Sequence, residues 1–157
     1  MGLKPTYVKA AFEYAYDELK KQNVQNKVTL FYNDYDTYFS VDDELALISY
    51  INEGEEAKIC GGMQSHVDIK RPTLEEYGNA LKAFINAGLE VQITELDITI
   101  NFDTDDTDGR TPTYAYKNEK ETDADQAAFT KDFIKQIVDI QKNRDKTISP
   151  KGITGIT

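Results

Sequence analysis

Apolar residues recur along the chain with a helical period in some segments and gather into short runs in others. From Thr6 to about Lys21 they lie three and four positions apart, which predicts a helix with one apolar face. The same period predicts further helices at 40–54, 73–88 and about 127–142. Short apolar runs rich in β-branched and aromatic residues predict strands at 27–33, 58–64, 89–100 and 152–157.

Capping signals mark two of the helix starts. Ser40 with Asp43 resembles a capping box, and Thr73 with Glu76 gives a stronger one. Strand–helix units repeat about every thirty residues, as βαβ crossovers do, so we expect a parallel α/β sheet. An open doubly wound sheet and part of a (β/α)8 barrel both satisfy this pattern. A start on a helix and an end inside a strand suit neither architecture as a complete unit.

Charge and composition narrow the class of ligand. The net charge of −10 opposes binding to DNA or RNA, which needs clustered Lys and Arg. No window is apolar enough for a membrane span, and the first ten residues lack the apolar stretch of a secretory signal. Cys60 is the only cysteine, which excludes an intrachain disulfide, and its apolar surroundings predict a buried, inert thiol.

Polar side chains lie at or near the carboxyl end of each of the first three predicted strands, where parallel α/β folds gather their functional groups. They are Tyr32, Asn33 and Asp34, then Gln64, Ser65 and His66, then Thr94, Glu95 and Asp97. Any one of these residues alone fits the capping of a helix or a loop. Three clusters on successive strand ends instead indicate a site built around a carboxylate.

The run VQITELDITI places Glu95 and Asp97 among apolar residues, where each carboxylate needs a partner. His66, the only histidine, could lie between them, oriented by Asp97 and in turn orienting Glu95. Such a carboxylate–imidazole–carboxylate relay does not by itself identify a substrate. An unrelated α/β binding domain with accidental motifs remains an alternative, and it would be favoured if these three side chains were far apart.

The segments YNDY, GMQSH and ITELD, in this order and at roughly this spacing, resemble the fifth, sixth and seventh strands of glycoside hydrolase family ten endo-β-1,4-xylanases. YVKAAFEYA resembles the helix before the fifth strand, and GITGIT resembles the start of the eighth. The resemblance implies about four strands, five to eight, of a (β/α)8 TIM barrel with their helices. The whole chain, 1–157, would then be one partial catalytic domain.

The same resemblance implies the roles of five residues. Glu95 would be the nucleophile of a retaining hydrolase, forming a covalent glycosyl-enzyme that water then releases. His66 and Asp97 resemble the pair that holds the nucleophile, while Tyr32 and Gln64 resemble residues that line the sugar subsites. Asn33 is interpreted as structural. The resemblance implies xylan or xylo-oligosaccharide as ligand, an extracellular location, and neither metal nor organic cofactor.

The sequence departs from the family in what it lacks. The family's acid/base glutamate ends the fourth strand, before the helix with which this chain begins, and the tryptophan after the eighth strand has no counterpart. A half barrel would expose strand edges, so we expect self-association or pairing with the amino-terminal half. The alternative to a xylanase is therefore an inactive, self-associating half barrel that binds xylo-oligosaccharide weakly.

Residues 101–125 form the one segment without a match to the family. They have no period, carry eight acidic and three basic residues, and predict an acidic loop insertion. A calcium loop is a poor match, because Thr104 and Ala115 occupy the positions that need Asp and Glu. The loop could extend a cleft, with Tyr114 and Tyr116 available to stack on sugar rings.

Overall fold

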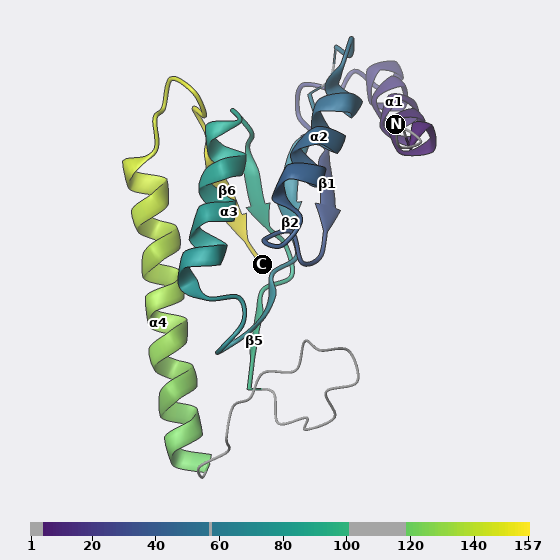
Figure 1. Ribbon diagram of the computed structural model, residues 1–157. Helices are drawn as coiled ribbons and strands as arrows, with labels where there is room; N and C mark the ends of the chain where they lie inside the picture. Colours follow the sequence, from purple (N-terminus) through teal and green to yellow (C-terminus); the bar gives the residue numbers. More distant parts are fainter. Residues whose placement is uncertain (1–4, 57, 101–118) are drawn as a thin grey trace.

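The computed structural model describes residues 5–56, 58–100 and 119–157, with side chains from Thr122 onward in the last helix. This part of the chain contains four helices and six strands, all drawn in Figure 1. The helices are α1 (Thr6–Lys21), α2 (Val41–Asn52), α3 (Leu74–Asn86) and α4 (Glu119–Asn143). The strands are β1 (Phe31–Asp34), β2 (Cys60–Met63), β3 (His66–Asp68), β4 (Val91–Ile93), β5 (Asp97–Thr99) and β6 (Ile153–Ile156).

Four strands form one parallel sheet in the order β1-β2-β4-β6, which confirms the predicted parallel α/β arrangement. Each helix contacts its neighbour in the row α1, α2, α3, α4, and α2, α3 and α4 cover one face of the sheet (Figure 1). β3 and β5 form a separate two-stranded parallel sheet beyond the carboxyl ends of β2 and β4.

The prediction of one strand over 89–100 is wrong, because this range contains two strands, β4 and β5. After β4 the backbone amides of Thr94 and Glu95 still bond to Met63 O and Gln64 O, at 2.9 and 3.0 Å. The chain then leaves the main sheet, and β5 pairs with β3 instead of extending β4. The apolar run is continuous across this change of partner, so its pattern could not reveal it.

Helix starts follow the capping signals in one case and not in the other. At α3 the capping box forms, since Thr73 Oγ1 accepts from Glu76 N at 3.2 Å and Thr73 N donates to Glu76 Oε2 at 2.8 Å. Ser40 precedes α2 but makes no side-chain cap, so that prediction is wrong. Its ψ of 27° departs from the extended cap conformation, and its hydroxyl donates to the buried Glu44 carboxylate at 3.1 Å.

The predicted acidic loop at 101–125 overlaps a helix, because α4 begins at Glu119. Residues 119–125 are polar and give no apolar period, yet four acidic residues near a helix N-terminus are favourable for the helix dipole. That part of the prediction is wrong. Thr104, Tyr114, Ala115 and Tyr116, named for a calcium loop and for stacking on sugar, lie outside the described residues.

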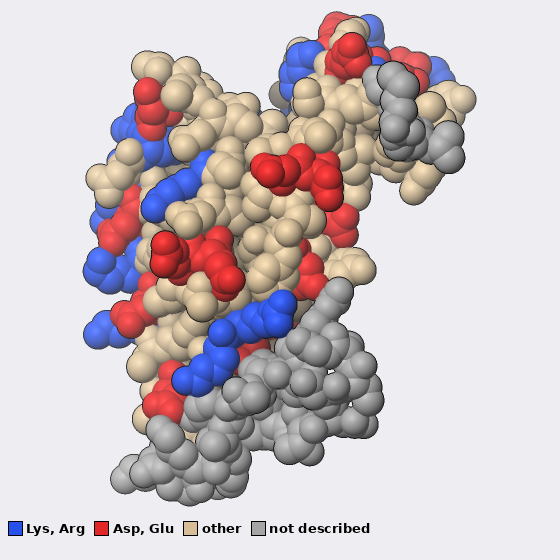
Figure 2. Space-filling view, in the orientation of Figure 1, with Lys and Arg blue, Asp and Glu red and all other residues tan. Residues whose placement is uncertain are grey.

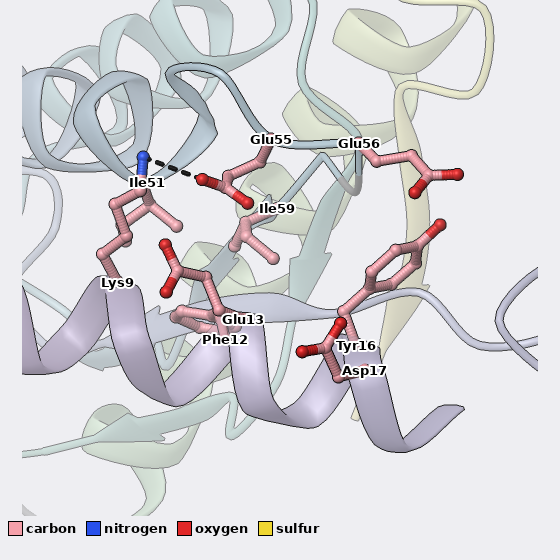
Figure 3. A pocket seen from close by; sticks show the side chains of 9 residues that line it. All are labelled: Lys9, Phe12, Glu13, Tyr16, Asp17, Ile51, Glu55, Glu56 and Ile59. Atoms are coloured by element: carbon pink, nitrogen blue, oxygen red, sulfur yellow. Dashed lines mark ion pairs between the residues drawn. The ribbon is translucent and has the colours of Figure 1, made fainter. Parts of the chain in front are cut away.

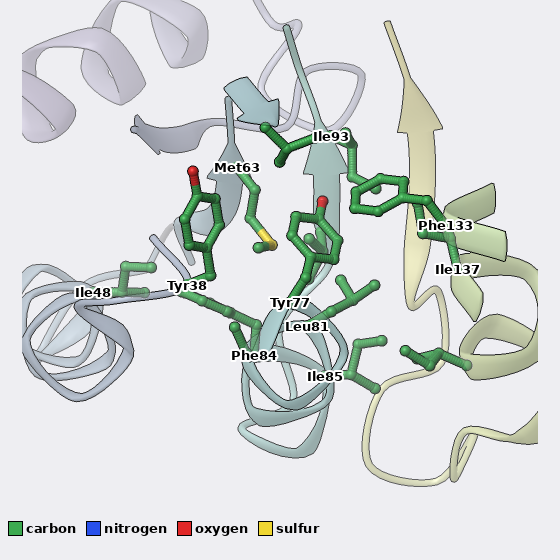
Figure 4. Close-up of a cluster of buried hydrophobic side chains, with 14 residues drawn as sticks. Tyr38, Ile48, Met63, Tyr77, Leu81, Phe84, Ile85, Ile93, Phe133 and Ile137 are labelled. Carbon is green, nitrogen blue, oxygen red and sulfur yellow. The ribbon is translucent and has the colours of Figure 1, made fainter. Parts of the chain in front are cut away.

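The hydrophobic core lies between the sheet and its helices, as Figure 4 shows. Tyr77 and Phe84 of α3 are fully buried against Met63 of β2, Ile93 of β4 and Phe133 of α4. The rings of Tyr77 and Phe133 pack with centroids 4.4 Å apart. Cys60, expected to be buried, is only partly so, and burial raises the pKa of its thiol.

Two consecutive glycines show how β2 separates the two faces of the sheet. A Cβ at Gly61 would lie 3.1 Å from the Phe84 ring on the helix side. A Cβ at Gly62 would lie 2.9 Å from Asn33 Oδ1, on the opposite face. β2 therefore packs closely against the core through Gly61 and against the polar face through Gly62.

Helix α1 packs less closely than the others, because none of its residues is buried. A cavity of about 250 Å³ separates it from α2, with Phe12, Tyr16 and Ile51 among its lining residues (Figure 3). Lys9 crosses this gap, donating to Glu53 O at 2.5 Å and pairing with Glu55 at 3.0 Å. Ile59, the residue before β2, also lines this cavity. The cavity therefore lies at the amino-terminal end of β2, whereas His66 follows the carboxyl end of that strand.

The surface carries both signs of charge. On the face in Figure 2, the described Lys and Arg residues alternate with Asp and Glu and form no continuous basic patch. None of the described helices has both the length and the apolar character that a membrane crossing requires.

Candidate active site

Glu95 lies just beyond the carboxyl end of β4, where the backbone still follows the neighbouring strand. Its amide donates to Gln64 O at 3.0 Å, and the next amide, of Leu96, donates to Thr157 O at 2.8 Å. The backbone on both sides of the Glu95 side chain is therefore tied to the strands that flank β4, β2 and β6.

His66 lies between the two carboxylates, as the sequence predicted. Its Nδ1 is 2.5 Å from Asp97 Oδ2, and its Nε2 is 3.4 Å from Glu95 Oε2. His66 and Asp97 are also paired residues in the β3–β5 ladder. The three side chains are thus brought together by backbone register as well as by their own contacts, which removes the observation that would favour accidental motifs.

The two carboxylates favour the charged form of the imidazole. The hydrogen bond to Asp97 is the main cause that raises the pKa of His66, and Glu95 adds to it. All three side chains are about half exposed, at 46–50%. Water therefore screens their charges, and the cluster is open to a ligand that approaches from the strand ends.

Asn33 is the residue that the sequence interpretation missed, because it was taken as structural. Its Nδ2 donates to Glu95 Oε1 at 3.0 Å, so each Glu95 oxygen faces a nitrogen, Asn33 on one side and His66 on the other. The Thr94 hydroxyl donates to Asn33 Oδ1 at 2.6 Å. The available signal was strand alternation, which puts Asn33 opposite Gly62 and on the same face as the site.

The backbone around His66 is fixed by two tyrosines. The Tyr38 hydroxyl lies 2.8 Å from His66 O and 2.9 Å from Asp36 Oδ1. Ser65 has a left-handed backbone (φ 67°), and its hydroxyl pairs with the buried Tyr77 hydroxyl at 2.8 Å. These bonds link the loop after β1, the start of β3 and helix α3.

Tyr32 and Gln64, predicted to line sugar subsites, have different positions relative to the site. Tyr32 alternates with Asn33 along β1, so its ring packs against the core on the helix side, and its hydroxyl donates to Asp34 at 2.8 Å. Burial raises the pKa of this hydroxyl. Gln64 supplies backbone bonds to Asp34 and Glu95, and its partly buried side chain adjoins His66 in sequence.

The arrangement suits a carboxylate that is held in one orientation while one side remains open. Within the described ranges, no group of three or more His, Cys, Asp or Glu side chains is arranged so that it could hold a metal ion. Among these residues, the side-chain contacts of Glu95 are with Asn33 and His66, and neither is a carboxyl group.

Comparison with known families identifies this arrangement. The model of the family described as "Glycosyl hydrolase family 10" matches residues 1–154. The chain belongs to glycosyl hydrolase family 10. Its four-stranded parallel sheet with a row of helices is accordingly part of a (β/α)8 barrel, as expected from the motifs.

Individual proteins and solved structures are similar to this chain. Endo-1,4-beta-xylanase A of Butyrivibrio fibrisolvens is 52% identical over 101 residues, which cover 63% of this chain and 24% of that protein. A Thermobacillus composti GH10 xylanase superposes with a TM-score of 0.72 at 23% identity, covering 98% of this chain and 44% of its own. A mutant protein solved in complex with xylotriose gives 0.68 at 27% identity, covering 96% and 41%.

The chain thus spans about a quarter of this curated relative and less than half of each of these two solved chains. The relatives' names describe hydrolysis of xylan by larger proteins.

Proposed function

We propose that this chain carries the nucleophile half of a retaining endo-β-1,4-xylanase, with Glu95 as the nucleophile. The observation that carries the proposal is the double support of the Glu95 carboxylate, by Asn33 on Oε1 and by His66 on Oε2. Asp97 fixes the imidazole from its other nitrogen. A carboxylate held in this way can attack an anomeric carbon without first reorienting.

The reaction would proceed in two displacements. Glu95 forms a bond to the anomeric carbon as the glycosidic oxygen leaves, and water then breaks that bond with net retention of configuration.

Xylan or xylo-oligosaccharide is the proposed ligand, and the proposed location is outside the cell. His66 and Asp97 act as positioning residues, and Gln64 beside them is proposed to face the sugar. Tyr32, on the helix side, is proposed to support the strand end beneath these residues.

Retaining hydrolysis needs a second carboxyl group about 5–5.5 Å from the nucleophile to protonate the leaving oxygen. The direct partners of Glu95 are an amide and an imidazole, so neither of them is this second carboxyl group. A second proposed function for the chain by itself is a half barrel that binds xylo-oligosaccharide and cleaves only substrates with good leaving groups. Association through the open strand edges of β1 and β6 is proposed to accompany either function.

The test uses a substrate that needs no acid. An activated aryl 2-deoxy-2-fluoro-β-xylobioside releases its aryl group unaided, and the fluorine slows release of the glycosyl-enzyme, which then accumulates. We expect a mass increase of one 2-deoxy-2-fluoroxylobiosyl unit, with the aryl group released as aryloxide, and after proteolysis this mass should be located on Glu95. Glu95→Gln should remain unlabelled, whereas Glu75→Gln, at an exposed position on α3, should label like the original chain.

Labelling of the original chain together with no hydrolysis of xylan would establish the half-barrel function. Labelling at another residue, or equal labelling of Glu95→Gln, would refute the assignment of the nucleophile. The mass of the labelled species in solution, measured by light scattering on the same sample, reports whether copies associate.

A further inference from the structure

A chain of two hydrogen bonds runs from Thr94 through Asn33 to Glu95. The Thr94 hydroxyl donates to Asn33 Oδ1 at 2.6 Å, and Asn33 Nδ2 donates to Glu95 Oε1 at 3.0 Å. Thr94 and Glu95 are consecutive, while Asn33 comes from β1, 61 residues before Thr94 in sequence. The network therefore fastens the end of β4 to β1 across the intervening strand β2.

The Asn33 amide has one favourable orientation between its two partners. A carboxylate only accepts hydrogen bonds, so Nδ2 faces Glu95, and the amide oxygen on the other side accepts from the Thr94 hydroxyl, which holds the amide in this orientation. The opposite orientation would place the amide oxygen against a carboxylate oxygen, without a proton between them. Thr94 thereby makes Asn33 a fixed donor to Glu95.

Gly62 provides the space that this amide occupies. Gly62 pairs with Asn33 in the β1–β2 ladder, and a Cβ there would lie 2.9 Å from Asn33 Oδ1 and 3.1 Å from Asn33 Cα. Real Cβ atoms essentially never approach as closely as the first distance. Asn33 can sit flat against β2 only because this position has no side chain.

We propose that Asn33, oriented by Thr94 and seated on Gly62, is a positioning residue that holds the Glu95 carboxylate toward His66. The proposal deepens the proposed function, because it concerns the same nucleophile, but its first test does not require turnover. The Glu95 side chain is 46% exposed, so few packing contacts restrain it. With Asn33 on Oε1, the other oxygen stays within 3.4 Å of His66 Nε2.

His66 can report the position of Glu95, because it is the only histidine in the chain. Its imidazole signals can be followed by NMR without overlap from other histidines while the pH is changed. Asp97 and Glu95 are the charged groups that raise its pKa. If Glu95 swings into solvent, its share is lost and the His66 titration moves to lower pH.

The experiment compares His66 titrations in the full chain and its variants. Glu95→Gln removes the whole contribution of Glu95 and sets the largest shift to be expected. Asn33→Ala should give at least half of that shift, and Thr94→Val should move the titration in the same direction. Thr94→Ser keeps the hydroxyl and should restore the original curve.

Asn52→Ala is the matched control. Asn52 also bridges two segments, through Nδ2 to Ile59 O at 3.1 Å and from Ile59 N to Oδ1 at 2.6 Å, but far from Glu95 in the fold. It should lower stability and leave the His66 titration unchanged. Original titration curves in Asn33→Ala and Thr94→Val, both folded by circular dichroism, would overturn the proposal.

Labelling with the fluorinated xylobioside separates this inference from the proposed function. If both are right, Asn33→Ala labels at least tenfold more slowly than the original chain. If His66 shifts as expected but the original chain is never labelled, Asn33 still positions Glu95 and the nucleophile assignment fails. If labelling is normal and His66 does not respond, the nucleophile stands and the role of Asn33 is refuted.

Discussion

Replacing Gly62 by alanine should disturb the site more than the core. The added Cβ would begin 2.9 Å from Asn33 Oδ1, and ordinary contact starts at 3.4 Å, so Asn33 must retreat by about 0.5 Å. The Asn33 backbone shares this close contact and belongs to a paired strand, so the side chain cannot simply rotate away. Displacement of Asn33 should lengthen and weaken its 3.0 Å bond to Glu95.

Two other glycines provide controls for this substitution. Gly61→Ala places its Cβ 3.1 Å from the Phe84 ring in the core, so both variants should lose about 1–3 kcal/mol from overpacking. Gly155→Ala meets only the Gln92 side chain, at 3.6 Å, and should stay within about 0.5 kcal/mol of the original. Unfolding in urea measures these free energies.

The His66 titration then distinguishes the two faces of β2. Gly62→Ala should lower the pH at which His66 titrates, because Glu95 loses its Asn33 partner, whereas Gly61→Ala should not. Equal His66 curves in the two variants would refute the reasoning, whatever their stabilities. So would a Gly62→Ala chain with the stability and the titration of the original.

Three further predictions concern stability. Burial raises the pKa of Glu44 to about 7, above its unfolded value of 4.5, so the folded state favours the protonated carboxyl group. This contribution to stability is complete below pH 4.5 and is lost as the pH rises through 7. Glu44→Gln should therefore flatten the pH dependence of the unfolding free energy by about 2–3 kcal/mol across that window, and an unchanged slope would contradict it. Thr73→Ala breaks the α3 capping box and should cost about 1 kcal/mol in urea unfolding, and no loss would refute the cap. Lys9→Ala should cost about 1 kcal/mol and make α1 the first segment to exchange its amide hydrogens, and uniform exchange would oppose this.

Much of the fold could be predicted because the relevant signals are local. The helical period of 6–21 gave the bounds of α1, and the Thr73–Glu76 pair gave the start of α3. The change of partner between β4 and β5 could not be predicted, because strand pairing depends on distant residues while the apolar run stays continuous. The early start of α4 was missed because acidic residues stabilise a helix N-terminus without giving an apolar period.

The site was predictable where chemistry is unusual and missed where it is ordinary. Glu95, Asp97 and His66 were identified because carboxylates in an apolar run need partners and the chain has one histidine. Asn33 and Thr94 gave no such signal, because asparagine and threonine at strand ends commonly bond to loops. Their role depends on Gly62, a residue whose contribution is the absence of a side chain.

The backbone beside His66 implies a trade-off between stability and activity. Asp36 and Ser65 both have positive φ, 52° and 67°, which costs non-glycine residues of order 1 kcal/mol or more each. Their side chains hold the loop and β3 through Tyr38 and Tyr77. Glycine at either position would relax the backbone but remove the bond to Tyr38 or Tyr77 that holds the backbone beside His66. A substitution that relieves strain at Asp36 or Ser65 is therefore expected to loosen the site.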